Sequence, residues 1–172
     1  ARVNEELAWV LQAQQGSDEA FTHLVETYQT PVFNLCYRML GEPDLAEDAA
    51  QETFLRAWKH LKRFDATRPL RPWLLSIASN LASNRRRSAG RYFAALTRAF
   101  RDEPTSINNT EENSSQALQA NDLWKAVQTL NLPDQQIVYL RYFLDLTVSE
   151  TAEVLQVAEG TVKSRMSRKK KK

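Results

Sequence analysis

The stretch Asp44 to Trp58, DLAEDAAQETFLRAW, predicts a helix with two chemically different sides. At 100° per residue one arc is apolar, as in a helix that faces a core; it holds Ala46, Ala50, Phe54, Ala57, Trp58 and Leu61. The opposite arc is mostly acidic and carries Asp44, Asp48, Gln51, Glu52 and Leu55. Like charges one turn apart slightly destabilise a helix, and a leucine among acidic side chains is typical of a docking surface. We therefore expect this face to bind a basic, partly apolar partner; the alternative is an ordinary solvated acidic face.

Composition limits the class of protein. The 172 residues are 42% hydrophobic, which is enough for one domain or two small ones. No apolar run approaches the ~20 residues of a membrane span, so we expect no membrane insertion. The single cysteine, Cys36, excludes an internal disulfide framework and lies in an apolar helical run. These features predict a buried thiol and a cytoplasmic location.

The net charge of +2 conceals an uneven distribution along the chain. The first basic cluster contains no acid and consists of Arg85, Arg86, Arg87, Arg91, Arg98 and Arg101. An acidic stretch without bases follows, with Asp102, Glu103, Glu111, Glu112 and Asp122. From Gly160 onward every charged side chain is basic. Two basic clusters separated by an acidic stretch predict two contacts with polyanions, joined by a solvated connector.

Helix boundaries in the first half follow from local signals. Residues 5–15 have a short amphipathic pattern, and Ser17 is a candidate N-cap for a longer helix that Gly41 ends. Pro31 inside that helix should kink it or mark a turn. The segment between Leu61 and Trp73 holds two prolines and four basic residues, which predicts a loop. Pro72 then suits the first turn of the next helix.

The helix that follows this loop has a polar side suited to nucleic acid. That side carries Ser76, Ser79, Asn80, Ser83 and Arg87, with Trp73 and Asn84 at its margin. Small polar side chains allow a ligand to approach closely, asparagine can read base edges, and arginine binds phosphates. Trp73 and Phe64, which lies in the adjacent basic loop, offer surfaces for an unstacked base. Either ring could instead be an ordinary core aromatic.

The second half predicts a helix-turn-helix. Residues 91–116 have the polar composition of a flexible linker. A first helix is then defined by Leu118, Leu123, Val127 and Leu130. We expect Asp134 to cap a second helix and Thr147, with Glu150, to form the capping box of a third. After a turn comes a basic helix, TVKSRMSRKKKK, with Val162 and Met166 facing inward. A short helix, a tight turn and a basic helix are the order in which the last helix enters the major groove.

Four motifs in sequence resemble those of bacterial RNA polymerase sigma factors of the extracytoplasmic-function type, group IV of the sigma-70 family. They are AEDAAQETF at 46–54, RPWLLSIASN at 71–80, LNLPDQQIVYLRY at 130–142 and EGTVKSR at 159–165. The resemblance implies an all-α chain of two small helical domains joined by a flexible linker. These would be a region 2-like domain at 1–90, a linker at 91–116 and a region 4-like helix-turn-helix domain at 117–172.

The resemblance also implies three sets of site residues. The clamp of the polymerase β′ subunit would be bound by Asp44, Asp48, Gln51, Glu52 and Leu55. The unpaired minus-ten strand would be bound by Arg63, Phe64, Arg68, Arg71, Trp73, Ser76, Asn80, Asn84 and Arg87. The minus-thirty-five duplex would be read by Arg141, Lys163, Ser164, Ser167 and Arg168. Departures from the family pattern are Asn84 in place of a frequent Asp, Gln156 in place of a frequent turn glycine, and Lys169–Lys172 at the end of the last helix.

The implied function is to bind the polymerase core, direct it to specific promoters and melt the minus-ten element. The implied partners are the β′ clamp, the β flap, promoter DNA in duplex and single-stranded form, and an anti-sigma factor. We expect no enzyme, metal or cofactor, because two histidines, one cysteine and four glycines supply no CxxC, HExxH or phosphate loop. One alternative is a stand-alone helix-turn-helix regulator, which would bind its operator unaided. A helical adaptor that binds only protein would leave both basic clusters unexplained.

Overall fold

The computed structural model describes residues 2–99 and 130–169, and its regular structure in these ranges is helical, which confirms the expected all-α class. The first part holds α1 (Arg2–Gln14), α2 (Asp18–Leu40), α3 (Pro43–His60), the 3-10 turn η1 (Leu61–Arg63) and α4 (Leu70–Ala99). The second part holds α6 (Leu132–Val138), the π-helical turn η2 (Tyr139–Phe143), α7 (Val148–Leu155) and α8 (Glu159–Lys169). The helix expected around residues 118–130 falls almost entirely outside these ranges, as does most of the expected linker.

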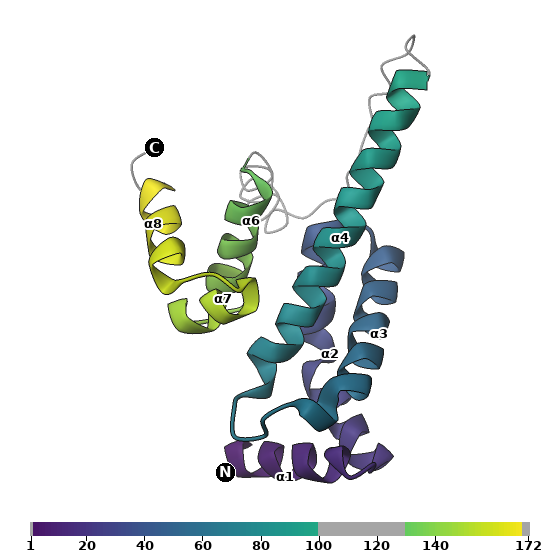
Figure 1. The fold of residues 1–172 in the computed structure, drawn as a ribbon, viewed down its shortest axis with the longest axis vertical. Coiled ribbons are helices and arrows are strands. Elements are labelled where there is room, and N and C mark those ends of the chain that lie inside the picture. Colours follow the sequence, from purple (N-terminus) through teal and green to yellow (C-terminus); the bar gives the residue numbers. More distant parts are fainter. Residues whose placement is uncertain (1, 100–129, 170–172) are drawn as a thin grey trace, which may run out of the picture.

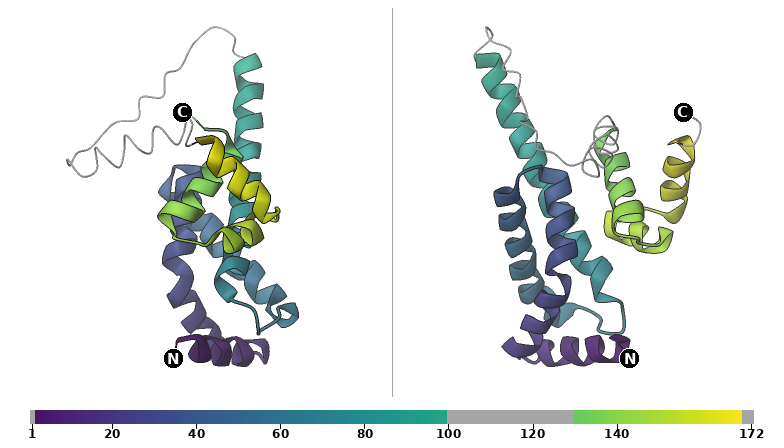
Figure 2. Two further views of the ribbon diagram at one scale, coloured as in Figure 1. Left: turned by 90° about the vertical axis from the view of Figure 1, so that its left-hand side faces the viewer. Right: turned by 180° about the vertical axis from the view of Figure 1, so that it is seen from behind.

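The first part is a bundle of α2, α3 and α4 with α1 lying across one end (Figure 1). The side chain of Gln14 fixes α1 there, because its amide donates to the carbonyl of Leu61 at 2.9 Å and to that of Phe64 at 2.7 Å. At the other end α4 continues beyond its neighbours (Figures 1 and 2). Its last turns, residues 91–99, continue as helix into the segment assigned to the linker from sequence.

Both ends of α2 form as the local sequence predicts. The hydroxyl of Ser17 accepts the N–H of Ala20 at 3.2 Å, and Gly41 takes the left-handed conformation with φ of 80°. No turn interrupts the helix at Pro31. A proline inside a helix removes one backbone hydrogen bond, but the adjoining Val32 and Leu35 are each only 1% exposed, so core packing holds this segment helical.

Capping in the second part is partly as expected. The prediction that Asp134 caps α6 is wrong: the side chain of Asn131 accepts the N–H of Asp134 at 3.1 Å, so the helix begins earlier. Pro133 suits that first turn, and Asp134 lies inside it, where a negative charge favours the helix dipole. The capping box of α7 is confirmed, since Thr147 and Glu150 each accept the other's backbone N–H, at 3.1 and 3.0 Å.

One apolar core runs through both parts of the chain. In the bundle it includes Leu24, Leu75 and the fully buried Cys36, as predicted for the thiol. The second part contributes four side chains that are at most 1% exposed, namely Tyr139, Leu140, Leu146 and Val154. A smaller cluster of Ile137, Ala152 and Val162 joins α6, α7 and α8. The hairpin of α6, η2 and α7 is therefore packed against the bundle, along α4 and the end of α2 (Figure 2).

Candidate nucleic-acid interface

Helix α3 has the two sides that its sequence predicts. Ala46, Ala49 and Ala57 are fully buried against the bundle. On the opposite arc Leu55 is 63% exposed, more than the other exposed leucines Leu7, Leu11 and Leu45. The rest of that arc is exposed at Asp44, Asp48 and Gln51 and half-buried at Glu52. The arc is thus an accessible acidic surface with one apolar side chain near its centre.

An apolar groove adjoins this surface and was not anticipated from sequence. It has a volume of about 470 Å³ and lies between α2 and α3, lined by Phe21, Val25, Phe54, Leu55 and Trp58 among others. The rings of Phe21 and Trp58 lie 4.8 Å apart and form part of its wall. A signal was present, because Phe21 and Val25 lie one turn apart at the edge of the apolar stripe of α2. Leu55 therefore lies at the rim of a recess into which an apolar partner side chain can fit.

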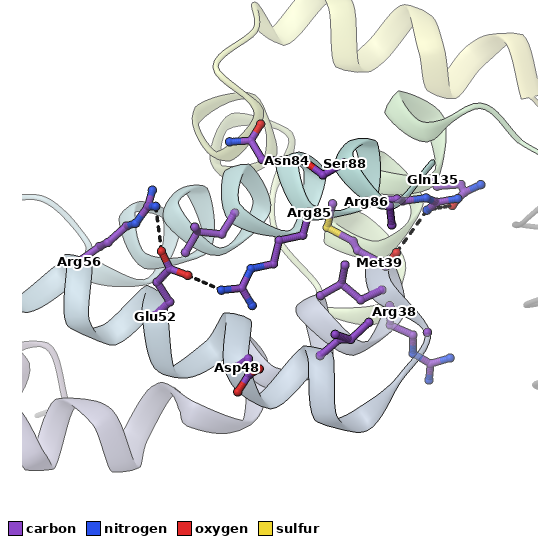
Figure 3. Close-up of a pocket in the computed structure, with 15 residues that line it drawn as sticks. Arg38, Met39, Asp48, Glu52, Arg56, Asn84, Arg85, Arg86, Ser88 and Gln135 are labelled. Carbon is purple, nitrogen blue, oxygen red and sulfur yellow. Dashed lines mark hydrogen bonds and ion pairs between the residues drawn. The ribbon is translucent and has the colours of Figure 1, made fainter. Parts of the chain in front are cut away.

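Glu52 is held by two arginines, as Figure 3 shows. Arg56 on the same helix lies 2.9 Å from one carboxylate oxygen, and Arg85 on α4 pairs with the other. Partial burial disfavours the charged carboxylate, but the hydrogen bonds and charges of Arg56 and Arg85 outweigh it and lower the pKa of Glu52. The ion pairs border a cavity of about 700 Å³ between the end of α2, α3 and α4. Glu52 thus cross-links two helices within the predicted polymerase-binding face.

The residues predicted on α4 do share one side of that helix. Trp73, Ser76, Asn80, Asn84 and Arg87 follow at steps of three or four residues, which places them in one row. Asn80, Asn84 and Arg87 are exposed, whereas Trp73 and Ser76 are half-buried. Arg87 donates to the side-chain oxygen of Asn84 at 3.0 Å. Arg91 and Arg98 continue on the side of Arg87, and the helix carries no carboxylate between Leu70 and Ala99, so this side attracts a polyanion.

The loop before α4 packs against the first residue of this row. Phe64 is only 8% exposed and packs against Trp73 with ring centroids 4.7 Å apart. In this position it braces the tryptophan rather than presenting its own face to solvent. Asp65 accepts the hydroxyl of Thr67 at 2.6 Å and its backbone N–H at 3.0 Å, which closes the loop and lowers the pKa of Asp65. Arg63, from the predicted set, is exposed beside it.

The hairpin of the second part lies along the flank of the same row. Gln136 on α6 donates to the hydroxyls of Ser83 at 2.7 Å and Ser79 at 3.3 Å. These two serines, part of the polar side predicted from sequence, are consequently only 9% and 3% exposed. Two arginines of the predicted DNA-binding loop also contact the hairpin: Arg68 pairs with Glu153, and Arg71 donates to the carbonyl of Leu144.

Helix α8 lies on the far side of α6 and α7 from α4 (Figure 1). Its inward side chain, Val162, is fully buried, and the predicted contact residues Lys163, Ser164, Ser167 and Arg168 are exposed. The fifth predicted residue differs, since Arg141 is half-buried on η2. Its guanidinium donates to the carbonyl of Leu146, and its Nε is buried without a hydrogen-bond partner. The guanidinium of Arg141 is therefore engaged within the second part of the chain, unlike the four exposed residues of α8.

Other classes of site lack support in the described part of the chain. No group of three or more histidine, cysteine, aspartate or glutamate side chains in those ranges is arranged to hold a metal ion. Among the same residues, none of the helices combines the length and apolar character that crossing a membrane requires.

Comparisons with known proteins agree on one family. Residues 24–92 match the family model for sigma-70 region 2, and residues 120–172 match that for sigma-70, region 4. The chain is 33% identical to the ECF RNA polymerase sigma factor SigW of Bacillus subtilis over 167 residues, covering 92% of this chain and 89% of SigW.

Two solved structures are similar over most of the chain. The sigma factor RpoE of Bartonella quintana, solved in complex with the anti-sigma factor NepR, is 25% identical with a TM-score of 0.68 and covers 86% of this chain and 90% of its own. CnrH, solved with the cytosolic domain of CnrY, is 21% identical with a TM-score of 0.72 and covers 95% of this chain and 91% of its own. The likeness to CnrH concerns the fold alone.

Proposed function

Because the chain belongs to the ECF sigma factors of RNA polymerase, which are transcription initiation factors, we propose that it works through three separate surfaces. The acidic face of α3 binds the polymerase core, the polar row of α4 holds the unpaired minus-ten strand, and α8 reads the minus-thirty-five duplex. The observation that carries the proposal is the row on α4, where amides and arginines align along a helix without a single carboxylate.

The α3 surface suits a polymerase clamp that is basic and partly apolar. Asp44 and Asp48 supply negative charge that steers and orients such a partner. Leu55, together with the groove behind it, supplies an apolar centre that can be dehydrated on binding. Glu52 is already neutralised by Arg56 and Arg85, so its main contribution is to hold α3 against α4.

The row on α4 suits a single strand better than a duplex. Trp73 is half-buried on Phe64 and keeps a fixed orientation, so a base that leaves the duplex can stack on it. Asn80 and Asn84 can bond to the exposed edges of such a base, and Arg87 can bind the phosphate beside it. Extruding a base costs a few kcal/mol, and stacking contributes ~1–3 kcal/mol per base. Melting therefore needs the polymerase to position the strand, and no catalytic step is involved.

The second half supplies duplex recognition. Lys163, Ser164, Ser167 and Arg168 form the exposed side of α8, which follows a tight turn as a recognition helix does. Arg141 holds the carbonyl of Leu146 and stabilises the turn before α7, so it would have to rearrange to reach DNA. The same half would meet the β flap of the polymerase.

Two further features belong to the proposal. An anti-sigma factor is a proposed partner, because the similar RpoE chain was solved in complex with one. The protein would act in the cytoplasm, where RNA polymerase and promoter DNA are found.

Permanganate footprinting on a promoter bound by core polymerase and this protein tests the proposal directly. Unpaired thymines in the minus-ten element should react, and Asn80→Ala should lower their reactivity roughly tenfold, since a base contact contributes ~1–3 kcal/mol. Gln29→Ala, which removes an exposed amide from α2, is the matched control and should leave melting intact. Unchanged melting in Asn80→Ala would contradict the proposed strand contact. Tight duplex binding without polymerase would instead favour a stand-alone regulator.

A further inference from the structure

A recess on α4 lies within reach of the row proposed to hold the minus-ten strand. It has a volume of about 350 Å³ and is lined by Asn84, Arg87, Ser88 and Arg91. These four side chains are exposed and come from this one helix, at and beyond the last turn of the row. Sites for small ligands usually have volumes of roughly 300–1,000 Å³. The recess is therefore large enough to admit a single base.

The side-chain amide of Asn84 has a defined orientation in this recess. A guanidinium group can only donate hydrogen bonds, so the atom of Asn84 that lies 3.0 Å from Nη2 of Arg87 is the amide oxygen. Arg87 is itself anchored, because its Nε donates to the backbone carbonyl of Ser83, one turn earlier, at 3.5 Å. Since the amide oxygen of Asn84 is engaged in this way, Asn84 offers a ligand the N–H groups of its NH2.

The other side chains that line the recess are donors as well. Arg91 can only donate, and it bonds to the hydroxyl oxygen of Ser88 at 3.4 Å, which leaves the hydroxyl hydrogen of Ser88 to be donated. Arg87 retains N–H groups beyond those that it uses within the helix, because a guanidinium carries five. None of the lining residues is acidic. Every side chain around the recess can therefore donate a hydrogen bond to a ligand.

Such a set of donors distinguishes two classes of base. Guanine and thymine, the keto bases, carry a carbonyl oxygen at the edge where adenine and cytosine carry an amino group. A carbonyl oxygen can accept from Asn84 and from the arginine beside it. An amino group would meet further donors, and a polar group that loses its bonds to water without replacement weakens binding. Asparagine can read adenine by accepting from N6 while it donates to N7, but the bond from Arg87 opposes that mode at Asn84.

We propose that Asn84, oriented by Arg87, selects a keto base at the position of the minus-ten strand that enters this recess, and discriminates there against adenine and cytosine. The inference rests on the proposed function, because it assumes that the row on α4 holds that strand. It names the class of base that one residue of the row reads. It also gives Arg87 a positioning role in addition to its proposed phosphate contact.

A promoter library that carries each of the four bases at every position of the minus-ten element tests this selection. It is transcribed by core polymerase with the full chain, and the transcripts are counted by sequencing. At one position guanine or thymine should be favoured over adenine and cytosine by roughly fivefold, near the lower limit for one base contact.

Reversing the hydrogen-bonding character of residue 84 gives the sharpest comparison. Asn84→Asp keeps the shape of an exposed side chain, so the variant should fold, but it replaces the donors with acceptors. The preference at the same position should shift toward the amino bases, and the preferences at other positions should stay unchanged. Asn34→Asp makes the same substitution at an exposed position of α2 and should retain the wild-type preferences. Identical preferences at every position in wild type and Asn84→Asp would overturn the inference.

A further variant separates the two roles of Arg87. Arg87→Met removes the bond to Asn84 and allows the amide to turn, so discrimination against adenine at this position should fall by roughly threefold, as expected for one hydrogen bond. Loss of a phosphate contact alone would lower transcription equally for all four bases, and an unchanged preference would therefore overturn the positioning role. Absence of promoter-specific transcription by the intact protein would instead refute the proposed function.

Discussion

Glu52 connects the stability of the bundle to the surface proposed for polymerase. Its pKa is lowered in the folded chain, while the same carboxyl titrates near ~4.3 when unfolded. The folded state therefore binds the proton less tightly than the unfolded state. The resulting stabilisation is complete above the unfolded pKa and is lost as the pH falls through the folded pKa.

Urea unfolding of wild type and Glu52→Gln at several pH values measures this effect. Between about pH 5 and pH 3 the wild type should lose more stability than Glu52→Gln, because only the wild type loses a charged partner for Arg56 and Arg85. In an Arg56→Gln/Arg85→Gln background the same substitution should alter the pH profile little. Parallel profiles of wild type and Glu52→Gln would contradict the ion-pair account.

Single residues were predictable from sequence where the signal is local. Leu55 stands out on an acidic arc, and its 63% exposure agrees with that pattern. Gln156 stands where a turn glycine is common, and it takes the left-handed conformation with φ of 56°. Phe64 and Arg141 were not predictable in orientation, because the sequence of a basic loop and of a mostly apolar helix with one arginine leaves open which side chains turn inward. Phe64 is buried through its packing on Trp73, and the guanidinium of Arg141 turns toward the carbonyl of Leu146; neither contact is apparent from the sequence pattern.

At the scale of the element, the capping box of α7 offers a quantitative test. The hydroxyl of Thr147 accepts the backbone N–H of Glu150, and the backbone N–H of Thr147 donates to the carboxylate of Glu150. Thr147→Ala should lower the free energy of unfolding by ~1 kcal/mol, the usual value for an N-cap. Ser149→Ala, at an exposed position of the same helix, is the control and should change it by less than half as much. Equal effects of the two substitutions in urea unfolding would show that the cap does not stabilise α7.

Element boundaries show where local signals suffice and where they fail. Ser17, Gly41 and Thr147 act as the sequence predicts. Each forms its capping hydrogen bond with a residue no more than four positions away. The π-helical turn at η2 could not be predicted, since its extra residue is stabilised by packing of Tyr139 and Leu140 against a distant part of the chain. Asp134 was wrongly predicted to be the N-cap of α6. The residue that caps this helix, Asn131, lies in a segment whose composition also predicts a loop.

At the scale of the whole molecule, the sequence predicted two helical parts but not that they share a core. Composition indicates where a chain is polar, whereas the pairing of Gln136 with two serines on α4 depends on docking. Ser79 and Ser83 were consequently interpreted as part of a DNA-binding side, and in the structure they lie in the contact between the parts. The acidic surface of α3 and the basic side of α8 were predictable because neither is covered by another element.

The central claim is that this chain directs polymerase to promoters through α3, and run-off transcription with purified core polymerase on a genomic promoter pool tests it most directly. The intact protein should yield specific transcripts. Asp48→Arg/Leu55→Ala should reduce them at least tenfold, and the charge-matched control Glu26→Arg/Leu11→Ala, at exposed positions of α2 and α1, should retain them. Equal transcription by Asp48→Arg/Leu55→Ala and the intact protein would contradict the assignment of α3. No specific transcripts from the intact protein would contradict the function itself.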